Sequence, residues 1–86
     1  MKIKVYGRVQ GVCFRYYTVQ KAQQLGVSGW VKNCSDGTLE AFVIGNEDSV
    51  NNMVDWCHQG PSQARVDKVT VINESNLNEY MNFSVI

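Results

Sequence analysis

Residues 27–44 read Val-Ser-Gly-Trp-Val-Lys-Asn-Cys-Ser-Asp-Gly-Thr-Leu-Glu-Ala-Phe-Val-Ile and carry the clearest structural signal in the chain. Its two ends, 27–33 and 38–44, are rich in residues that favour β-strands. The segment between them contains Asp36 and Gly37, a pair typical of the tight turn in a β-hairpin. The stretch therefore predicts a hairpin. In its second strand, alternation places three residues on a shared face, namely Leu39, Ala41 and Val43.

A strand and a helix, joined by a glycine-bearing loop, are predicted upstream of the hairpin. Residues 2–8 alternate between polar and apolar side chains, which is typical of a strand. Helical spacing begins at Phe14, and Gly26 stands where a helix C-terminus favours glycine. The first unit is therefore strand, loop, helix. The residues that recur at the helical period are Phe14, Thr18, Ala22 and Leu25.

A second helix is predicted directly after the hairpin. Asn46 is a suitable N-cap, and Glu47 and Asp48 place negative charge at the positive end of the helix dipole. Gly60 and Pro61 then stop the helix. Its apolar face follows the spacing i, i+3, i+4, i+7 and consists of Val50, Met53, Val54 and Cys57.

The remaining apolar residues predict one further strand and suggest a short last one. Val66, Val69 and Val71 mark the first of these, and Phe83 and Val85 mark the second. The element order is then βαββαβ, for which the natural packing is an antiparallel sheet with two helices on one face. We therefore expect an α+β fold, a ferredoxin-like sandwich.

The other face of this sheet is expected to be largely open. Trp30, Phe42 and Ile44 fall on it, and we interpret them as partly buried under loops rather than as a binding platform. RNA-recognition modules use the same element order and stack bases on open-face aromatic residues. The aromatic-rich pattern of those modules is absent around residues 38–44, so an RNA-binding module is the weaker alternative.

Length and charge limit the number of domains and the class of partner. The chain has 86 residues, 44% of them hydrophobic, so residues 1–86 are expected to form a single domain around one core. Eight Lys and Arg residues balance eight Asp and Glu residues, which gives a formal net charge of zero. A neutral chain lacks the positive field that drives non-specific nucleic-acid binding, so any anion must be held by a local site.

Neither a membrane span nor a secretory signal is expected. Apolar runs such as residues 41–44 are far shorter than the ~20 residues needed to cross a bilayer. Residues 1–7 carry charge where a secretory signal needs an apolar stretch, so we expect a cytoplasmic protein. The odd number of cysteines favours a reducing compartment, although one disulfide stays open, and without a C-x2-C pair no metal site is expected. The three cysteines are Cys13, Cys34 and Cys57.

Residues 7–15 read Gly-Arg-Val-Gln-Gly-Val-Cys-Phe-Arg and join the first strand to the first helix. Main-chain N–H groups can converge at such a place, and the helix dipole there favours negative charge. Gly11 is expected to remove the Cβ that would obstruct a curled path. Arg15 is unfavourable at a helix start unless an anion lies beside it, and its guanidinium can hold two phosphate or carboxylate oxygens.

The residues alone favour a plainer interpretation of this loop. Two glycines also suit a tight turn, with Arg15 paired to a surface carboxylate. Neither of the standard nucleotide motifs, GxxxxGK followed by Ser or Thr and G-x-G-x-x-G, is present. Cys13 lies too close to Arg15 for the cysteine–arginine loop of thiol phosphatases, and we interpret it as a small packing residue, not as a nucleophile.

Two parts of the chain resemble the signature segments of the acylphosphatase family. The first is residues 7–15, quoted above, and the second is Gly-Trp-Val-Lys-Asn at 29–33 followed by Asp-Gly-Thr-Leu-Glu at 36–40. The element order, the length and the ending Asn-Phe-Ser-Val at 82–85 are similar as well, so the resemblance covers nearly the whole chain. It implies hydrolysis of the carboxyl–phosphate bond of acyl phosphates to a carboxylate and inorganic phosphate.

The resemblance also implies roles for individual residues. Arg15 matches the arginine that binds the substrate phosphate, and Asn33 matches the asparagine that positions the attacking water. Many members have a hydroxyl residue after that asparagine, whereas this chain has Cys34, a difference that concerns one minor hydrogen bond. The amides of the loop complete the phosphate site and belong to Gln10, Gly11, Val12, Cys13 and Phe14.

Arg15, the loop amides and Asn33 are sufficient for the hydrolysis of an acyl phosphate. The leaving group is a carboxylate whose conjugate acid has a pKa of about 4, so it needs no general acid. Phosphoryl transfer passes through a loose state that the protein has mainly to position and neutralise. Arg15 and main-chain donors can do so without a metal or cofactor, while the amide of Asn33 orients a water. Alkyl phosphate esters, whose leaving groups need acid or metal assistance, should be poor substrates.

The remaining polar residues are assigned ordinary roles. His58, late in the second helix, is expected to be a surface residue, Asp36 to serve turn geometry and Glu40 to lie on the solvated surface. A non-catalytic regulatory domain that binds a small anion stays an alternative, because it differs from the enzyme only in turnover. The physiological acyl phosphate stays open, and we expect a monomer without a nucleic-acid or membrane partner.

Overall fold

The computed structural model describes residues 1–74 and 80–86. Its helices and strands follow one another in the predicted βαββαβ order, with the short last strand added. In chain order they are β1 (Lys2–Arg8), α1 (Phe14–Leu25), β2 (Ser28–Asn33), β3 (Leu39–Ile44), α2 (Glu47–Gln59), β4 (Arg65–Ile72) and β5 (Phe83–Val85).

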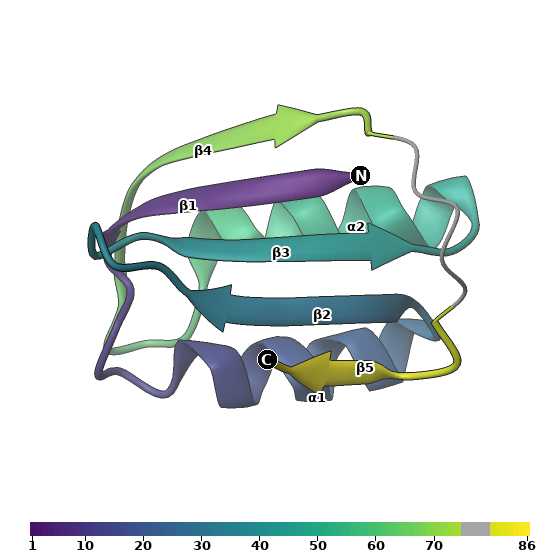
Figure 1. Cartoon of the computed structure of the whole chain (residues 1–86), viewed down its shortest axis with the longest axis horizontal. Coiled ribbons are helices and arrows are strands. Elements are labelled where there is room, and N and C mark those ends of the chain that lie inside the picture. Colours follow the sequence, from purple (N-terminus) through teal and green to yellow (C-terminus); the bar gives the residue numbers. More distant parts are fainter. Residues whose placement is uncertain (75–79) are drawn as a thin grey trace.

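The strands form one sheet in the spatial order β4-β1-β3-β2-β5 (Figure 1). Strands β1 to β4 pair antiparallel, as predicted, whereas β5 runs parallel to β2. The sheet is therefore mixed rather than purely antiparallel. The cause is visible in the chain path, because β4 ends at the end of the sheet where β2 begins, and β5 starts from that same end (Figure 1).

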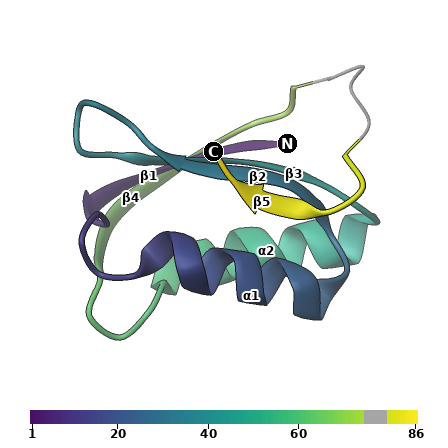
Figure 2. The same cartoon turned by 60° about the horizontal axis from the view of Figure 1, so that its bottom comes forward.

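Both helices lie against one face of the sheet, as predicted, and the core fills the space between the two layers (Figure 2). Phe14 of α1 packs edge-on against Trp56 of α2, with ring centroids 5.5 Å apart. Burial of such apolar side chains is the main favourable contribution to folding. The innermost side chains of the core are Ile3, Val5, Val9, Phe14, Ala22, Val31, Leu39, Ala41, Val43, Met53 and Cys57.

The turn between β2 and β3 is held by its own hydrogen bonds. The Cys34 N–H donates to the Thr38 oxygen at 2.9 Å, and the Gly37 N–H donates to the Cys34 oxygen at 3.1 Å. Asp36 accepts the N–H of Thr38 at 3.1 Å and its hydroxyl at 2.5 Å, which confirms its predicted role in the turn. An ion pair of 3.3 Å between Asp36 and Lys4 ties the turn to β1.

Phe42 on the open face of the sheet is covered by neighbouring rings. Trp30 stacks against it at a centroid distance of 6.1 Å, and Tyr80 lies 6.0 Å away. Only 2% of Phe42 is exposed, so the expected burial of this residue is confirmed. Because both rings would have to move before a base could stack on Phe42, the open face does not resemble an RNA-binding platform there.

Neither helix in the described ranges is long and apolar enough to cross a membrane.

Candidate functional site

The β1–α1 loop, residues 9–13, curls because two of its residues are left-handed. The φ angle is 74° at Gly11 and 62° at Cys13. A Cβ at Gly11 would meet no atom within 4 Å, so the expectation that glycine removes a steric obstacle there is wrong. Glycine suits this position because it adopts a positive φ without strain. The packing role expected of Cys13 is also wrong, because the curl leaves Cys13 exposed and buries its neighbours Val12 and Phe14.

The two helices begin in different ways. At α2, the Asn46 side chain accepts a main-chain N–H at 2.8 Å and two acidic residues follow, as the sequence predicts. Helix α1 begins after Cys13 without a side-chain cap and without an acidic residue in its first turn. Arg15 adds a positive charge to that turn. The start of α1 is thus left open and positive, which favours a bound anion.

Hydrogen-bond donors of this region are unused in the described part of the chain. The main-chain N–H groups of residues 10–14 donate to no acceptor there. The guanidinium of Arg15 forms neither an ion pair nor a hydrogen bond with a described residue, so the interpretation in which it pairs with a surface carboxylate finds no partner. Unused main-chain N–H donors, close in sequence to a guanidinium without a partner among the described residues, suit a phosphate or carboxylate.

Arg15 and Asn33 line the same cavity, of about 650 Å³, although they come from different elements. Asn33 is the last residue of β2, at the end of the sheet where the β1–α1 loop also lies (Figure 1). Its Oδ1 atom is buried and lacks a hydrogen-bond partner among residues 1–74 and 80–86. An unpaired buried oxygen costs about 1–3 kcal/mol, so this position indicates a place for a water or ligand.

The cavity contains some of the predicted phosphate-site residues but not all of them. Gly11, Cys13 and Phe14 line it together with Arg15 and Asn33, whereas Gln10 and Val12 do not. The two outside the lining would contribute only through main-chain N–H groups. Four further lining residues were missed by sequence reasoning, because no local pattern links them to the site: Val9, Tyr16, Val19 and Val85.

The side chain of Gln10 joins the β1–α1 loop to the β2–β3 turn. Its Nε2 donates to the main-chain oxygen of Cys34 at 2.7 Å and to that of Thr38 at 2.9 Å. An amide nitrogen carries two N–H groups, so each carbonyl can receive its own. Because Cys34 directly follows Asn33, Gln10 fixes the loop relative to Asn33. The sequence carries no signal for this contact, which spans 24 positions.

Glu40 is not on the solvated surface, which corrects the sequence expectation. Its side chain is only 13% exposed and pairs with Lys2 at 3.2 Å. The Cys34 thiol also points to it, with Sγ 3.9 Å from Oε2. Glu40 lies on β3, the middle strand of the sheet, where side chains from the strands on either side cover it.

Titratable groups outside the cavity have structural explanations. Hydrogen bonds from Thr38, assisted by Lys4, lower the pKa of Asp36 to about 2. Burial raises the pKa of Cys57 to about 12, which keeps that thiol protonated, and all three cysteines are free. His58 is exposed, as predicted, with Nδ1 3.0 Å from the main-chain oxygen of Val54. Within the described residues, no group of three or more His, Cys, Asp or Glu side chains could hold a metal ion.

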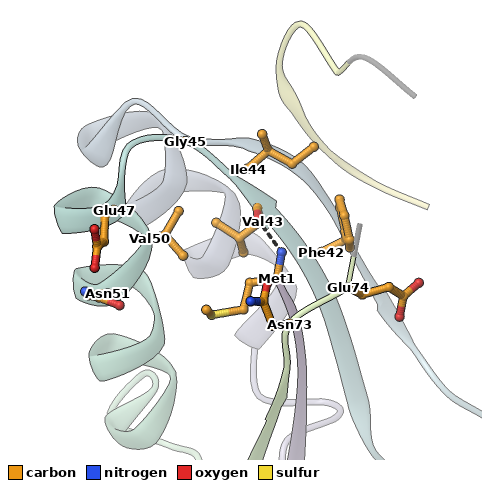
Figure 3. Close-up of a pocket in the computed structure, with 10 residues that line it drawn as sticks. All are labelled: Met1, Phe42, Val43, Ile44, Gly45, Glu47, Val50, Asn51, Asn73 and Glu74. Atoms are coloured by element: carbon orange, nitrogen blue, oxygen red, sulfur yellow. Dashed lines mark hydrogen bonds between the residues drawn. The ribbon is translucent and has the colours of Figure 1, made fainter. Parts of the chain in front are cut away.

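A second cavity, of about 480 Å³, lies between the first turns of α2 and the ends of β1, β3 and β4 (Figure 3). Its positive group is the Met1 ammonium, which donates to the Val43 oxygen at 3.0 Å and whose pKa is lowered by burial. Glu47 and Glu74 line the same cavity. An anion here would meet two carboxylates and an ammonium that already has a partner, so this cavity does not suit a phosphate.

Comparisons with known sequences identify the family of this chain. The acylphosphatase family model matches residues 1–85. An acylphosphatase of Geobacter sulfurreducens is 49% identical over 83 residues, covering 96% of this chain and 91% of that protein. Acylphosphatase-2 of Homo sapiens is 48% identical over 85 residues, covering 95% of this chain and 86% of that protein.

Solved structures lead to the same family. The crystal structure of acylphosphatase from Bacillus subtilis matches with a TM-score of 0.94 at 34% identity, covering 99% of this chain and 94% of that one. An acylphosphatase structure from Coxiella burnetii matches with a TM-score of 0.87 at 38% identity, covering 99% and 88%. Sequence and fold thus agree over almost the whole length. The chain belongs to the acylphosphatase family.

Proposed function

We propose that Arg15 and the amides of residues 10–14 hold the phosphoryl group of an acyl phosphate while Asn33 positions the attacking water. Family membership makes the chain an acylphosphatase enzyme, which hydrolyses acyl phosphates to a carboxylate and inorganic phosphate. The assignment of residues to steps is the proposal. One observation carries it, namely that a guanidinium and a buried amide oxygen, both without a partner among residues 1–74 and 80–86, line a single cavity.

On the phosphate side, the charge to be stabilised is spread over the peripheral oxygens of the phosphoryl group. The guanidinium of Arg15 presents N–H donors in a fixed fork that matches two such oxygens. Main-chain N–H groups of the β1–α1 loop can take the remaining lone pairs. Because these donors are unused by described residues, no hydrogen bond to a described residue has to break when the phosphate binds.

On the water side, the Oδ1 of Asn33 accepts one hydrogen of the water and leaves the oxygen lone pair directed at phosphorus. A carboxamide does not titrate, so it orients the water and does not deprotonate it. The bond from the water oxygen to phosphorus forms as the bond from phosphorus to the acyl oxygen breaks. The water proton passes to a phosphoryl oxygen, and the carboxylate leaves as a weak base without a proton.

The proposal extends to the setting in which the enzyme works. We place residues 1–86 in the cytoplasm as a single-domain monomer, without a metal, a cofactor or a nucleic-acid partner. Three free cysteines suit a reducing compartment, and the formal net charge of zero gives no general attraction to nucleic acid. Arg15 and the loop amides supply the positive potential that a metal would otherwise provide.

A benzoyl phosphate assay tests the proposal. Purified protein should release benzoate and inorganic phosphate in equal amounts, and inorganic phosphate should inhibit competitively. If the protein binds inorganic phosphate but does not hydrolyse benzoyl phosphate, the regulatory anion-binding domain is favoured instead. A gel-shift titration with RNA at low salt separates the remaining alternative, because an RNA-binding module would shift the probe and the enzyme would not.

A further inference from the structure

The cavity shared by Arg15 and Asn33 is larger than the reacting group. Three phosphoryl oxygens and one water, at about 30 Å³ each, fill only a small part of its volume of about 650 Å³. The phosphoryl group and the acyl group are joined through one oxygen, so the acyl group must extend into the space that is left. The walls of that space therefore bear on which acyl group is accepted.

Those walls are apolar. Val9 is buried, Val19 is half-buried against the core, and Val85 and Tyr16 are 47% and 59% exposed. Among the described residues that line the cavity, Arg15 carries the only charge. A second phosphate or carboxylate on the acyl group would therefore lie against valine and tyrosine side chains without a cation of its own, which is unfavourable.

The exposed part of this wall is held in place before any substrate binds. The Tyr16 hydroxyl accepts a hydrogen bond from Gln20 Nε2 at 2.7 Å, and its ring packs edge-on against Tyr17 at 5.2 Å. Val85 lies on β5, opposite Val31 of β2. A rigid apolar surface costs little ordering entropy when a ligand covers it, so it can contribute to specificity.

We propose that Tyr16, Val19 and Val85 form an acyl subsite, and that the preferred substrates are acyl phosphates with an apolar aliphatic or aromatic acyl group. This inference rests on the proposed function of the same cavity. It ranks hydrocarbon acyl phosphates above those with a second charged group, and above acetyl phosphate, whose single methyl group covers little of the wall.

The first test compares acetyl, butyryl and hexanoyl phosphate on the wild-type enzyme. Their carboxylate leaving groups have similar basicity, so differences in kcat/KM report on the acyl chain and not on the chemistry. Each methylene that leaves water should raise kcat/KM by up to about fourfold. A value that is flat or falls along the series overturns the acyl subsite, whereas failure to hydrolyse any of the three overturns the proposed function.

A second comparison measures the effect of a charged group on the acyl part of the substrate. 4-Methylbenzoyl phosphate and 4-carboxybenzoyl phosphate release carboxylate leaving groups of similar basicity and differ in the substituent at the far end of the ring. The carboxylate should lower kcat/KM by about tenfold or more, because it is desolvated against apolar side chains. Equal values for the two substrates contradict the proposal.

Matched variants test whether Val85 and Tyr16 belong to the acyl subsite. Val85→Thr replaces a methyl group by a hydroxyl at nearly constant volume, and Val71→Thr makes the same change at a residue that is 41% exposed on β4, the opposite edge of the sheet. Val85→Thr and Tyr16→Ser should lower the hexanoyl-to-acetyl ratio of kcat/KM severalfold, and Val71→Thr should not. An unchanged ratio in the two wall variants, or an equal fall in the control, removes these residues from the subsite.

Inhibition by phosphonates, which are not hydrolysed themselves, provides a second readout of the acyl subsite. Hexylphosphonate should compete more strongly than methylphosphonate with benzoyl phosphate, and Val85→Thr should narrow that difference. Circular dichroism of each variant shows whether it is folded before its ratio is interpreted. Equal inhibition of the wild-type enzyme by the two phosphonates contradicts an apolar subsite.

Discussion

The Nε2 atom of Gln10 lies 2.7 Å from the main-chain oxygen of Cys34, so a side chain of the β1–α1 loop contacts the residue that follows Asn33. The same nitrogen lies 2.9 Å from the Thr38 oxygen, which closes the turn. The proposed phosphate site and the proposed water site are thus held together by one amide. Misplacement of reacting groups by ~1 Å can cost about a hundredfold in rate, so this link bears on catalysis.

Gln10→Ala should lower kcat about tenfold to a hundredfold while the inhibition constant of phosphate changes less, because Arg15 and the loop amides remain. Steady-state kinetics with benzoyl phosphate and inorganic phosphate measure the two effects separately. Gln24→Ala, an exposed glutamine of α1, is the control and should behave as wild type. A wild-type kcat in Gln10→Ala would show that the link is structural only.

Arg15→Ala should abolish phosphate binding and turnover together. Loss of one transition-state donor typically costs about 100-fold to 1,000-fold in kcat, and here the lost group also carries the charge that attracts the phosphate. Arg65→Ala is the control, because Arg65 is exposed and pairs with Asp67 at 3.0 Å, away from the cavity. Retention of phosphate inhibition at the wild-type concentration in Arg15→Ala would contradict the assigned role.

Asn33→Ala should reduce kcat strongly and leave phosphate binding nearly intact, since orientation of the water matters chiefly in the transition state. The removed Oδ1 has no partner among the described residues, so the variant breaks no internal hydrogen bond there and should stay folded. The exposed Asn52 of α2 provides the matching alanine control. If kcat in Asn33→Ala equals that of wild type, another group positions the water.

The ionisation of Asp36 should make the free energy of unfolding depend on pH in the acidic range. Its pKa is lowered from 3.8 to about 2, first by hydrogen bonds from Thr38, so the ionised form is favoured in the folded state. The resulting stabilisation is complete above pH 3.8 and is lost as the pH falls through about 2. In Thr38→Val the pKa of Asp36 should rise toward its ordinary value, as an NMR titration of the carboxyl carbon would show. A titration midpoint unchanged by that substitution would assign the shift to the main-chain N–H of residue 38 and to Lys4 instead of the Thr38 hydroxyl.

Activity should survive exhaustive treatment with EDTA, because Arg15 and the loop amides are proposed to supply all of the positive potential at the phosphate. The measurement is benzoyl phosphate hydrolysis before and after chelation, with dialysis against metal-free buffer. Loss of activity that added Mg²⁺ or Zn²⁺ restores would revive a metal-assisted mechanism.

Local signals in the sequence determined the elements and the family. Alternation over residues 2–8 and 38–44, helical spacing from Phe14 and the Asn46 cap each depend on neighbours in the chain, and each predicted its element correctly. The two signature segments placed Arg15 and Asn33 as candidates before any contact was known. Such features are readable because turns, caps and amphipathic faces are formed by residues that are close in sequence.

The way in which the candidate residues come together depends on the packing of the whole chain. The addition of β5 beside β2 puts Val85 into the wall of the cavity, and the middle position of β3 buries Glu40, which looked like a surface residue. Gln10 reaches the carbonyl of Cys34 only because the sheet brings loop and turn to one end. These contacts depend on the spatial order of the strands and on long-range packing, which no local pattern of residues encodes.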